Sequence, residues 1–297
     1  MTDFRVPHPL MVPPVSEREL AAKLRAHGNS SLGEFPVLQA ALDIAAYARI
    51  QQNLPFPDFD SIIEQMNELS HSAGEWVAIF DNRPPADEQV EWLRLIMHEQ
   101  GGFEGATQNY DASENADIAA VIENRRGLPV SLGLLYIHIA RCCGFGVEGL
   151  NFPGHFLTRL IGDETSAIFD PFNDARILEP QDLRATLKRF HGQTAEMDLS
   201  FTRGVRDRDV LIRMQNNLKF RALRESRLDD AVLVVERLLL LDPGNGVFWQ
   251  EAGLIHQRIG NLRAAVLAFE NAVETMQEPA LSVRVQSLLD EVRSQLN

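Results

Sequence analysis

The stretch that decides the fold runs from Arg125 to Phe172 and reads RRGLPVSLGLLYIHIARCCGFGVEGLNFPGHFLTRLIGDETSAIFDPF. Its first half opens with the turn signal Gly127–Pro129, and an apolar run then continues to Cys143-Gly144. Because this run is apolar on nearly every side, it predicts a buried helix. Ser131 would lie at the N-terminal end of that helix, where backbone N–H groups have no partners within the helix.

The second half of the stretch predicts three short strands. They cover Val147–Phe152, Phe156–Leu160 and Ser166–Phe169. Gly162-Asp163 predicts a two-residue type II′ hairpin between the last two strands, because glycine leads the turn. In that register His155 lies directly opposite Asp170, with Cβ atoms about 5 Å apart. A carboxylate in this place can hold the imidazole in one tautomer and stabilise its charged form.

Ser131, His155 and Asp170 therefore have the layout of a cysteine protease, with a nucleophile at a helix end, a base and an orienting carboxylate. The quoted stretch, with its RRGLPVS, PGHF and FDPF motifs, resembles the transglutaminase-like superfamily. It is most similar to a bacterial branch with helices before the core and a tetratricopeptide-like segment after it. The resemblance covers about residues 35–297. It implies an α+β fold with a transglutaminase/papain-like core, in which Cys, His and Asp form the triad of active members.

The residue in the position of the nucleophilic cysteine is Ser131, and this departure bears on function. A thiol has a pKa near 8.5 and ionises readily beside an imidazole and a helix N-terminus, whereas a hydroxyl does not. Serine chemistry then requires that His155 removes the proton during attack and that an oxyanion hole is present. Cys142 and Cys143 lie about 17 Å away at the other end of the helix, so we expect them to be buried apolar residues.

Composition limits the classes of partner. The chain has 297 residues and a net charge of −14, which argues against nucleic acid and against anionic membrane surfaces as ligands. The first 15 residues contain no apolar core of a signal peptide, and two adjacent cysteines make no disulfide framework. The histidines have no metal-ligand spacing. We therefore expect a soluble cytoplasmic protein without a metal or cofactor.

Breaks at proline and glycine predict four segments. We expect a mobile tail at 1–15, a helical region at 16–100, the transglutaminase-like core at 101–200 and tetratricopeptide-like helices at 205–297. In the core, Asp111 or Ser113 is expected to cap a helix over Asn115–Arg125, and Asn115 to cap or brace a loop. The Gly-rich loop 102–110 is expected to border the site.

The C-terminal segment shows a 34-residue period, and it also holds the one basic region of the chain. Gly253, Gly260, Ala265, Phe269 and Ala272 match tetratricopeptide spacing. A repeat array needs about three repeats to be stable on its own, and this segment has two, so we predict that the repeats dock on the core. The region Arg203–Arg227 has eight Lys or Arg against three acids, which we interpret as a solvated or internally paired face.

Two main functions follow. The first is a non-catalytic protein- or peptide-binding module, a pseudoenzyme that has lost its thiol. The alternative is a serine-dependent acyl-transfer hydrolase, an amidase or peptidase, in which Ser131 is the nucleophile, His155 the base and Asp170 the orienting group. A purely structural scaffold is a third function. The three residues can also have purely structural roles, with Ser131 as a helix N-cap and His155 and Asp170 as a buried pair.

Overall fold

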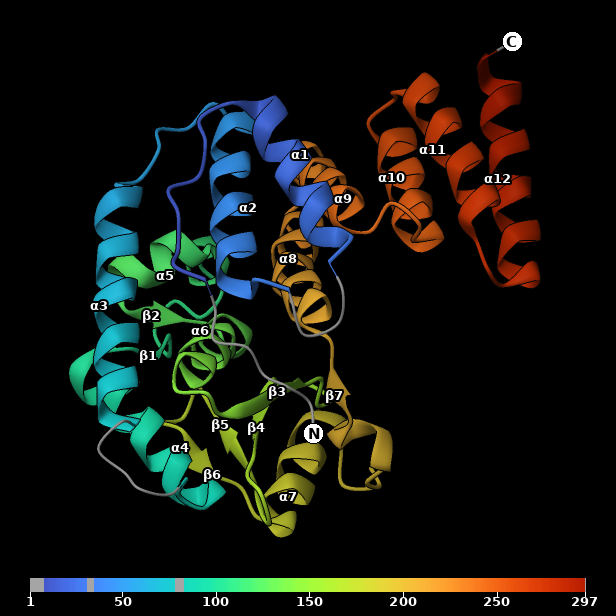
Figure 1. The fold of residues 1–297 in the computed structure, drawn as a ribbon. Coiled ribbons are helices and arrows are strands. Elements are labelled where there is room, and N and C mark those ends of the chain that lie inside the picture. Colours follow the sequence, from blue (N-terminus) through green and yellow to red (C-terminus); the bar gives the residue numbers. More distant parts are fainter. Residues whose placement is uncertain (1–7, 31–34, 78–82, 297) are drawn as a thin grey trace.

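The structure is a computed structural model that describes residues 8–30, 35–77 and 83–296 (Figure 1). It confirms the predicted α+β class, because helices that precede and follow the core in the sequence pack around a small, antiparallel five-stranded sheet. No helix within these described ranges is long and apolar enough to cross a membrane.

The described residues of the N-terminal region form four α-helices. They are α1 (Glu17–Gly28), α2 (Val37–Gln51), α3 (Phe59–Val77) and α4 (Ala86–Arg94), and the last continues as a π-helical turn, η1 (Leu95–Gln100). Ser16 caps α1, since its Oγ accepts from the backbone N–H of Glu19. Residues 1–7 of the expected mobile tail lie outside the described residues. Met11 is bonded through its backbone N–H and carbonyl to the side-chain amide of Gln39 on α2.

The central helix α6 (Pro129–Cys142) packs on one face of the sheet, and α7 (Pro180–His191) covers the other (Figure 1). The sheet order is β6-β5-β4-β3-β7. Its strands are β3 (Gly146–Leu150), β4 (Leu157–Ile161), β5 (Ser166–Asp170), β6 (Arg176–Ile177) and β7 (Gly204–Val205). Alternation along β4 divides the faces: Leu160 joins the main core with α6, whereas Leu157 packs with Leu183 of α7.

The predicted hairpin register is wrong by two residues. β4 and β5 pair with Thr158 opposite Phe169 and Ile161 opposite Ser166, so the loop holds four residues, 162–165, instead of two. The backbone N–H of Gly162 donates to the carbonyl of Thr165 across this longer loop. A shift of two leaves every side chain on its predicted face, because side chains alternate with a period of two.

The start of the core departs from the sequence prediction. Residues Ser113–Ala116 form a 3₁₀ turn, η2, and α5 begins only at Ile118 and ends at Asn124. Its cap is Asp117, whose carboxylate accepts from the N–H of Ala119; the prediction that Asp111 or Ser113 caps this helix is wrong. Beside it, β1 (Glu104–Gly105) and β2 (Arg126–Gly127) pair in parallel.

The C-terminal segment is a series of antiparallel helices. They are α8 (Asp207–Arg224), α9 (Leu228–Leu241), α10 (Gly246–Arg258), α11 (Leu262–Thr275) and α12 (Pro279–Leu296). Val210, Met214 and Leu241 from α8 and α9 belong to the same buried cluster as α2 and α6, so these two helices dock on the core. Helices α10–α12 extend away from it (Figure 1), and α11 and α12 pack together in a separate cluster around Phe269 and Val285.

Candidate functional site

His155 and Asp170 meet beside the sheet, as the sequence predicts, although through a different register. The Nε2 atom of His155 lies 2.8 Å from Oδ1 of Asp170, and both side chains are about nine-tenths buried. If the β4–β5 register is extended by one residue, Leu157 lies opposite Asp170. His155 is two residues earlier, in the bend that precedes β4, and its side chain reaches Asp170 from there. Diagonal neighbours of this kind remain within reach of an aromatic side chain.

The Asp170 carboxylate is held in its charged form by several donors. Besides His155, the side-chain amide of Asn173 and the backbone N–H of Phe172 donate to its oxygens, the latter at 3.0 Å. Burial acts to raise the pKa of Asp170, but the bonds from His155, Asn173 and Phe172 together outweigh it and lower the pKa below its ordinary value. The carboxylate is therefore a fixed negative charge against the imidazole.

Aromatic rings enclose the imidazole of His155. Phe190 of α7 stacks on it with a centroid separation of 6.1 Å and an interplanar angle of 14°, and Phe172 meets it edge-on at 6.3 Å. Gly154 permits this approach: its φ is +74°, and a Cβ there would lie 2.6 Å from Cβ of Phe190. Within the described residues, Nδ1 of His155 has no hydrogen-bond partner.

Ser131 has a different partner from the one that catalysis requires. Its Oγ donates to the backbone carbonyl of Asn115 at 2.9 Å, and the residue has no exposed surface. No hydrogen bond joins it to His155 in the part of the chain that the structure describes. The N-cap of α6 is Leu128, without a side-chain capping bond, so the interpretation of Ser131 as an N-cap is wrong; it is the third residue of the helix.

Asn115 connects the N-terminus of α6 to a neighbouring loop. Its carbonyl accepts from both the Ser131 hydroxyl and the backbone N–H of Leu128. Its side-chain amide donates to the carbonyls of Asn109 and Tyr110, which agrees with the predicted loop-bracing role. The loop is therefore fixed from the inside of the core, through Ser131 and Asn115.

The same loop borders His155 and Asp170, as the Gly-rich sequence predicts. The ring of Tyr110 meets Phe172 edge-on at 5.8 Å, and a Cβ on Gly105 would lie 2.4 Å from the Phe172 carbonyl oxygen. Arg221 of α8 fastens the loop from outside by donating to the carbonyl of Ala112 at 2.6 Å.

Phe156, next to His155, points the opposite way, towards α6. A Cβ on Gly133 of α6 would lie 2.3 Å from its ring, and a Cβ on Gly149 of β3 would lie 2.6 Å from it. The ring thus fills the space that two glycines leave between helix and sheet. The guanidinium of Arg213 on α8 covers the same ring, with 5.6 Å from Cζ to the centroid.

The cysteines do not supply a replacement nucleophile. Burial raises the pKa of both thiols, that of Cys143 to about 12, so neither is a thiolate at neutral pH. Cys143 is buried against the carbonyl of Ala73, as expected of a small apolar residue.

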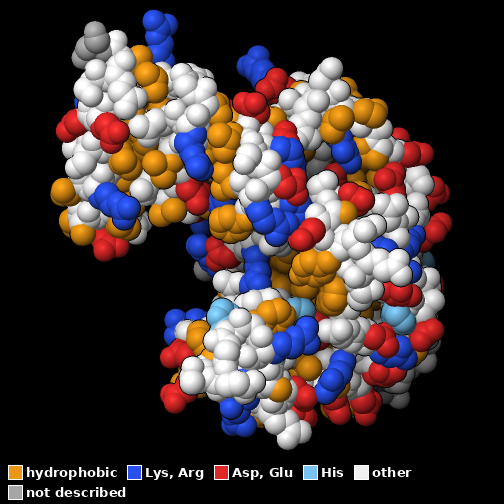
Figure 2. Space-filling view, turned by 180° about the vertical axis from the view of Figure 1, so that it is seen from behind, with side chains coloured by type: hydrophobic (Ala, Val, Ile, Leu, Met, Phe, Trp, Pro, Cys, Tyr) orange, Lys and Arg blue, Asp and Glu red, His pale blue; other side chains and the backbone are white. Residues whose placement is uncertain are grey.

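The molecular surface is hollowed between the α10–α12 lobe and the body. Figure 2 shows basic and hydrophobic side chains gathered at this hollow, with histidine surface at its edge.

A cavity of about 460 Å³ lies beside the Phe152–Gly154 turn, immediately before His155, and reaches Arg213 of α8. The sequence does not single out Arg213, Tyr110 and Phe190, because none of them belongs to the motifs around Ser131 and His155.

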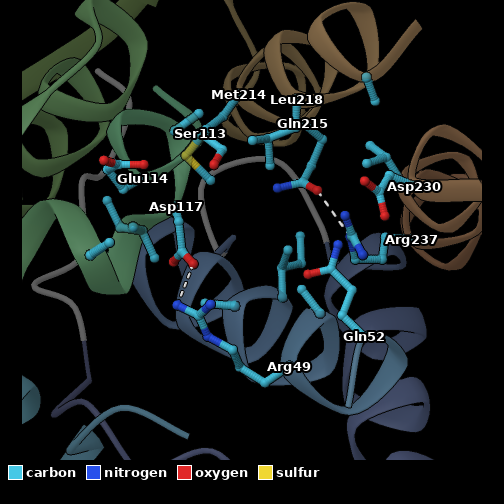
Figure 3. A pocket seen from close by; sticks show the side chains of 18 of the residues that line it. Arg49, Gln52, Ser113, Glu114, Asp117, Met214, Gln215, Leu218, Asp230 and Arg237 are labelled. Atoms are coloured by element: carbon cyan, nitrogen blue, oxygen red, sulfur yellow. Dashed lines mark hydrogen bonds and ion pairs between the residues drawn. The ribbon is translucent and has the colours of Figure 1, made fainter. Parts of the chain in front are cut away.

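A second cavity, of about 280 Å³, lies between α2, α5, α8 and α9, apart from the His155 cluster (Figure 3). Arg49 is paired there with Asp117 at 2.7 Å. The buried Arg237 donates to the side-chain carbonyls of Gln215 and Gln51. Because arginines and carboxylates alternate around it, this cavity has no marked excess of either charge.

Comparison with known proteins gives the following matches. The chain matches the Transglutaminase-like superfamily over residues 60–216 and a tetratricopeptide repeat over residues 218–297. It is 28% identical over 236 residues to a UPF0162 protein of Xylella fastidiosa, across 78% of this chain and 80% of the relative. It is 25% identical over 256 residues to a UPF0162 protein of Pseudomonas aeruginosa, across 86% and 90%.

Among solved structures, the chain is similar to menin, described in a crystal structure that reveals its binding site for the Mixed Lineage Leukemia protein. The TM-score is 0.44 with 8% identity, across 90% of this chain and 71% of menin.

Proposed function

This chain belongs to the transglutaminase-like superfamily, and from that premise we propose that it is a non-catalytic protein- or peptide-binding module. The family resemblance and the tetratricopeptide-like segment predicted from the sequence are confirmed by the two matches that together span residues 60–297. A tetratricopeptide-like segment is in general a protein-interaction element.

The observation that carries the proposal is the state of the Ser131 hydroxyl. It is fully buried, and its proton is donated to the Asn115 carbonyl instead of to an imidazole. A nucleophile needs its base within hydrogen-bond reach and a path for the substrate. In this arrangement Ser131 is a structural residue that connects α6 to the Tyr110 loop.

His155 and Asp170 retain a role in this proposal, as part of the binding surface. The imidazole is fixed by Asp170, is stacked by Phe190 and leaves Nδ1 without a partner among the described residues. A fixed polar atom between aromatic rings suits a peptide group, which offers both a hydrogen-bond donor and an acceptor. Phe190 itself is 44% exposed and so offers apolar contact area at the surface.

One observation favours the alternative, a serine-dependent amidase or peptidase. The His155–Asp170 bond is the one that orients the base in acyl-transfer enzymes. Catalysis would in addition require the fully buried Ser131 to break its bond to Asn115 and turn towards His155.

Binding of a random pool of fluorescein-labelled octapeptides, followed by fluorescence anisotropy, tests the proposal. We expect saturable binding to the wild type, binding about tenfold weaker for Phe190→Ala, and no loss for Phe56→Ala, a matched exposed phenylalanine between α2 and α3. Intact peptides should be recovered by mass spectrometry. Cleaved peptides that disappear with Ser131→Ala would establish the amidase instead, and absence of binding would refute the module.

A further inference from the structure

The cavity beside the Phe152–Gly154 turn has an unusual charge. Among the described residues, two arginines and no acidic residue line it: Arg203, which precedes β7, and Arg213, which comes from α8. The remaining lining is uncharged and comes from the turn before His155, the η3 turn (Leu199–Thr202) and β7. In a chain of net charge −14, a cavity lined by positive charge alone is a local exception.

The other cations of the basic stretch already have acidic partners. Within Arg203–Arg227, six of the eight form ion pairs: Arg206, Arg208, Lys219, Arg221, Arg224 and Arg227. Arg203 and Arg213 form none with the described residues, and they are the two that line the cavity. Of the two expectations for this stretch, a solvated or an internally paired face, the ion pairs favour the second, except at this cavity.

The acids near the cavity are committed elsewhere. Glu148, next to Gly204, is bonded to Arg159, and Asp207 forms two bonds with Arg141, of 2.6 and 2.8 Å. Asp198 is near enough to Arg203 to interact electrostatically, but its carboxylate accepts from the backbone N–H of Ser200 at 2.8 Å. No described carboxylate forms an ion pair with Arg203 or Arg213, and the exposed Asp198 acts on Arg203 only at longer range.

Arg213 is partly buried at the cavity, and water hydrates its guanidinium only in part. Burial lowers its pKa to about 10, since a guanidinium removed from water loses hydration, and Tyr110 offsets part of that effect. Contact with the Phe156 ring supplies some stabilisation. Its N–H groups donate to no acceptor among the described residues, although a guanidinium has five such donors.

We propose that this cavity is an anion subsite in which Arg203 and Arg213 bind the carboxylate of an acidic residue in a peptide ligand. This inference rests on the proposed function and names the class of peptide. The planar guanidinium fork matches a carboxylate in two parallel hydrogen bonds, which makes arginine the residue suited to this contact. Phe201, supported by edge-on contact at 6.3 Å with the fully buried Phe152, offers an apolar surface for the methylene groups of a glutamate side chain.

The position of the subsite relative to His155 sets the direction of the ligand. The Pro153-Gly154 turn lines the cavity on one side, and directly after it His155 stacks on Phe190. A peptide with its carboxylate on Arg213 would therefore place the neighbouring residues over Phe190 and the imidazole. The two arginines select the acidic residue, and the aromatic rings bind what is next to it.

The test uses the full-length protein and two small probes of equal size. N-acetyl-glutamate N-methylamide carries one carboxylate, and N-acetyl-glutamine N-methylamide is its neutral counterpart. In ¹⁵N-detected NMR titrations, the glutamate probe should shift the amide signals of Gly154 and Gly204 saturably, and the glutamine probe should not. Arg213→Gln should weaken this binding about tenfold or more. Arg203→Gln, an exposed position where folding is not at risk, should weaken it as well, and Arg184→Gln on the exposed face of α7 should leave it unchanged.

The results separate this inference from the proposed function. Equal shifts with both probes, or glutamate binding unaffected by Arg203→Gln and Arg213→Gln, would overturn the anion subsite even if the octapeptide pool still binds. Glutamate binding that depends on both arginines would establish the subsite, whatever the peptide pool does. If the pool in addition binds more tightly when a glutamate is fixed at its centre than when a glutamine is, the subsite acts in peptide recognition.

Discussion

The Ser131 hydroxyl donates its hydrogen bond to the backbone carbonyl of Asn115 across a fully buried contact of 2.9 Å. This bond gives the Ser131 hydroxyl a structural partner in the core. The Asn115 side chain continues the connection to the carbonyls of Asn109 and Tyr110, so that Ser131 helps to position the loop beside His155.

Replacement of Ser131 by alanine should lower stability and leave peptide binding in place. The lost bond is worth about 1 kcal/mol, because the Asn115 carbonyl still accepts from the N–H of Leu128. Urea denaturation measures this loss. Ser287→Ala serves as the control, since its hydroxyl also bonds a backbone carbonyl but lies exposed on α12, and it should change stability by less than about 0.5 kcal/mol. Unchanged stability of Ser131→Ala would contradict the structural role.

The charge of Asp170 should make its contribution to stability depend on pH. Because its pKa is lowered in the folded state, the stabilisation is fully present above the ordinary pKa of about 4 and is lost as the pH falls through the lower folded value. Asp170→Asn should therefore be destabilised at pH 7, and the difference from wild type should shrink below about pH 4. Denaturation curves across this range measure it. A difference in stability that stays constant with pH would show that it does not come from the charge of Asp170. Asp163→Asn serves as the control: Asp163 is exposed in the hairpin loop, and this variant should be as stable as the wild type at every pH.

Buried His138 should add a second source of acid sensitivity, in a higher pH range than that of Asp170. It is buried in α6, and burial, aided by Arg141, lowers its pKa to about 4. The unfolded chain takes up this proton near pH 6.5 and the folded chain does not, so stability should fall as the pH drops from about 6.5 to about 4, by up to about 3 kcal/mol. His138→Gln should remove that slope, whereas His71→Gln, at an exposed position on α3, should keep it. An unchanged slope in His138→Gln would assign the acid sensitivity to other groups.

Gly133→Ala should destabilise the protein although alanine is the better helix former. The added Cβ would lie 2.3 Å from the Phe156 ring, and overpacking of this kind costs about 1–3 kcal/mol, more than the gain of about 1 kcal/mol in helix propensity. The double variant Gly133→Ala/Phe156→Leu should recover part of the loss, because the smaller side chain frees the space. Thermal denaturation of the single and double variants measures both effects, and additive losses would contradict the packing.

The contact between His155 and Asp170 could be predicted even though its register was not. The strand pattern sets the face of each side chain, whereas the length of the turn sets the register, and GDET does not show whether two or four residues form the loop. An error of two residues preserves the face. Asp170 and the imidazole therefore meet as expected.

The partner of Ser131 could not be predicted in the same way. It depends on the η2 turn at Ser113–Ala116, which brings the Asn115 carbonyl to α6, and the sequence pattern there favours a longer helix. The two arginines without an ion-pair partner could not be predicted either. In the sequence Arg213 looks like the other basic residues of α8, and only the tertiary fold determines which of them meet a carboxylate.

Labelling with a fluorophosphonate, read by intact mass and peptide mapping, tests the central claim most directly. We expect no adduct on Ser131 in the wild-type protein, because its hydroxyl is buried and bonded to Asn115 instead of His155. A stoichiometric adduct that maps to Ser131 and disappears in His155→Ala would show an activated nucleophile and would contradict this account.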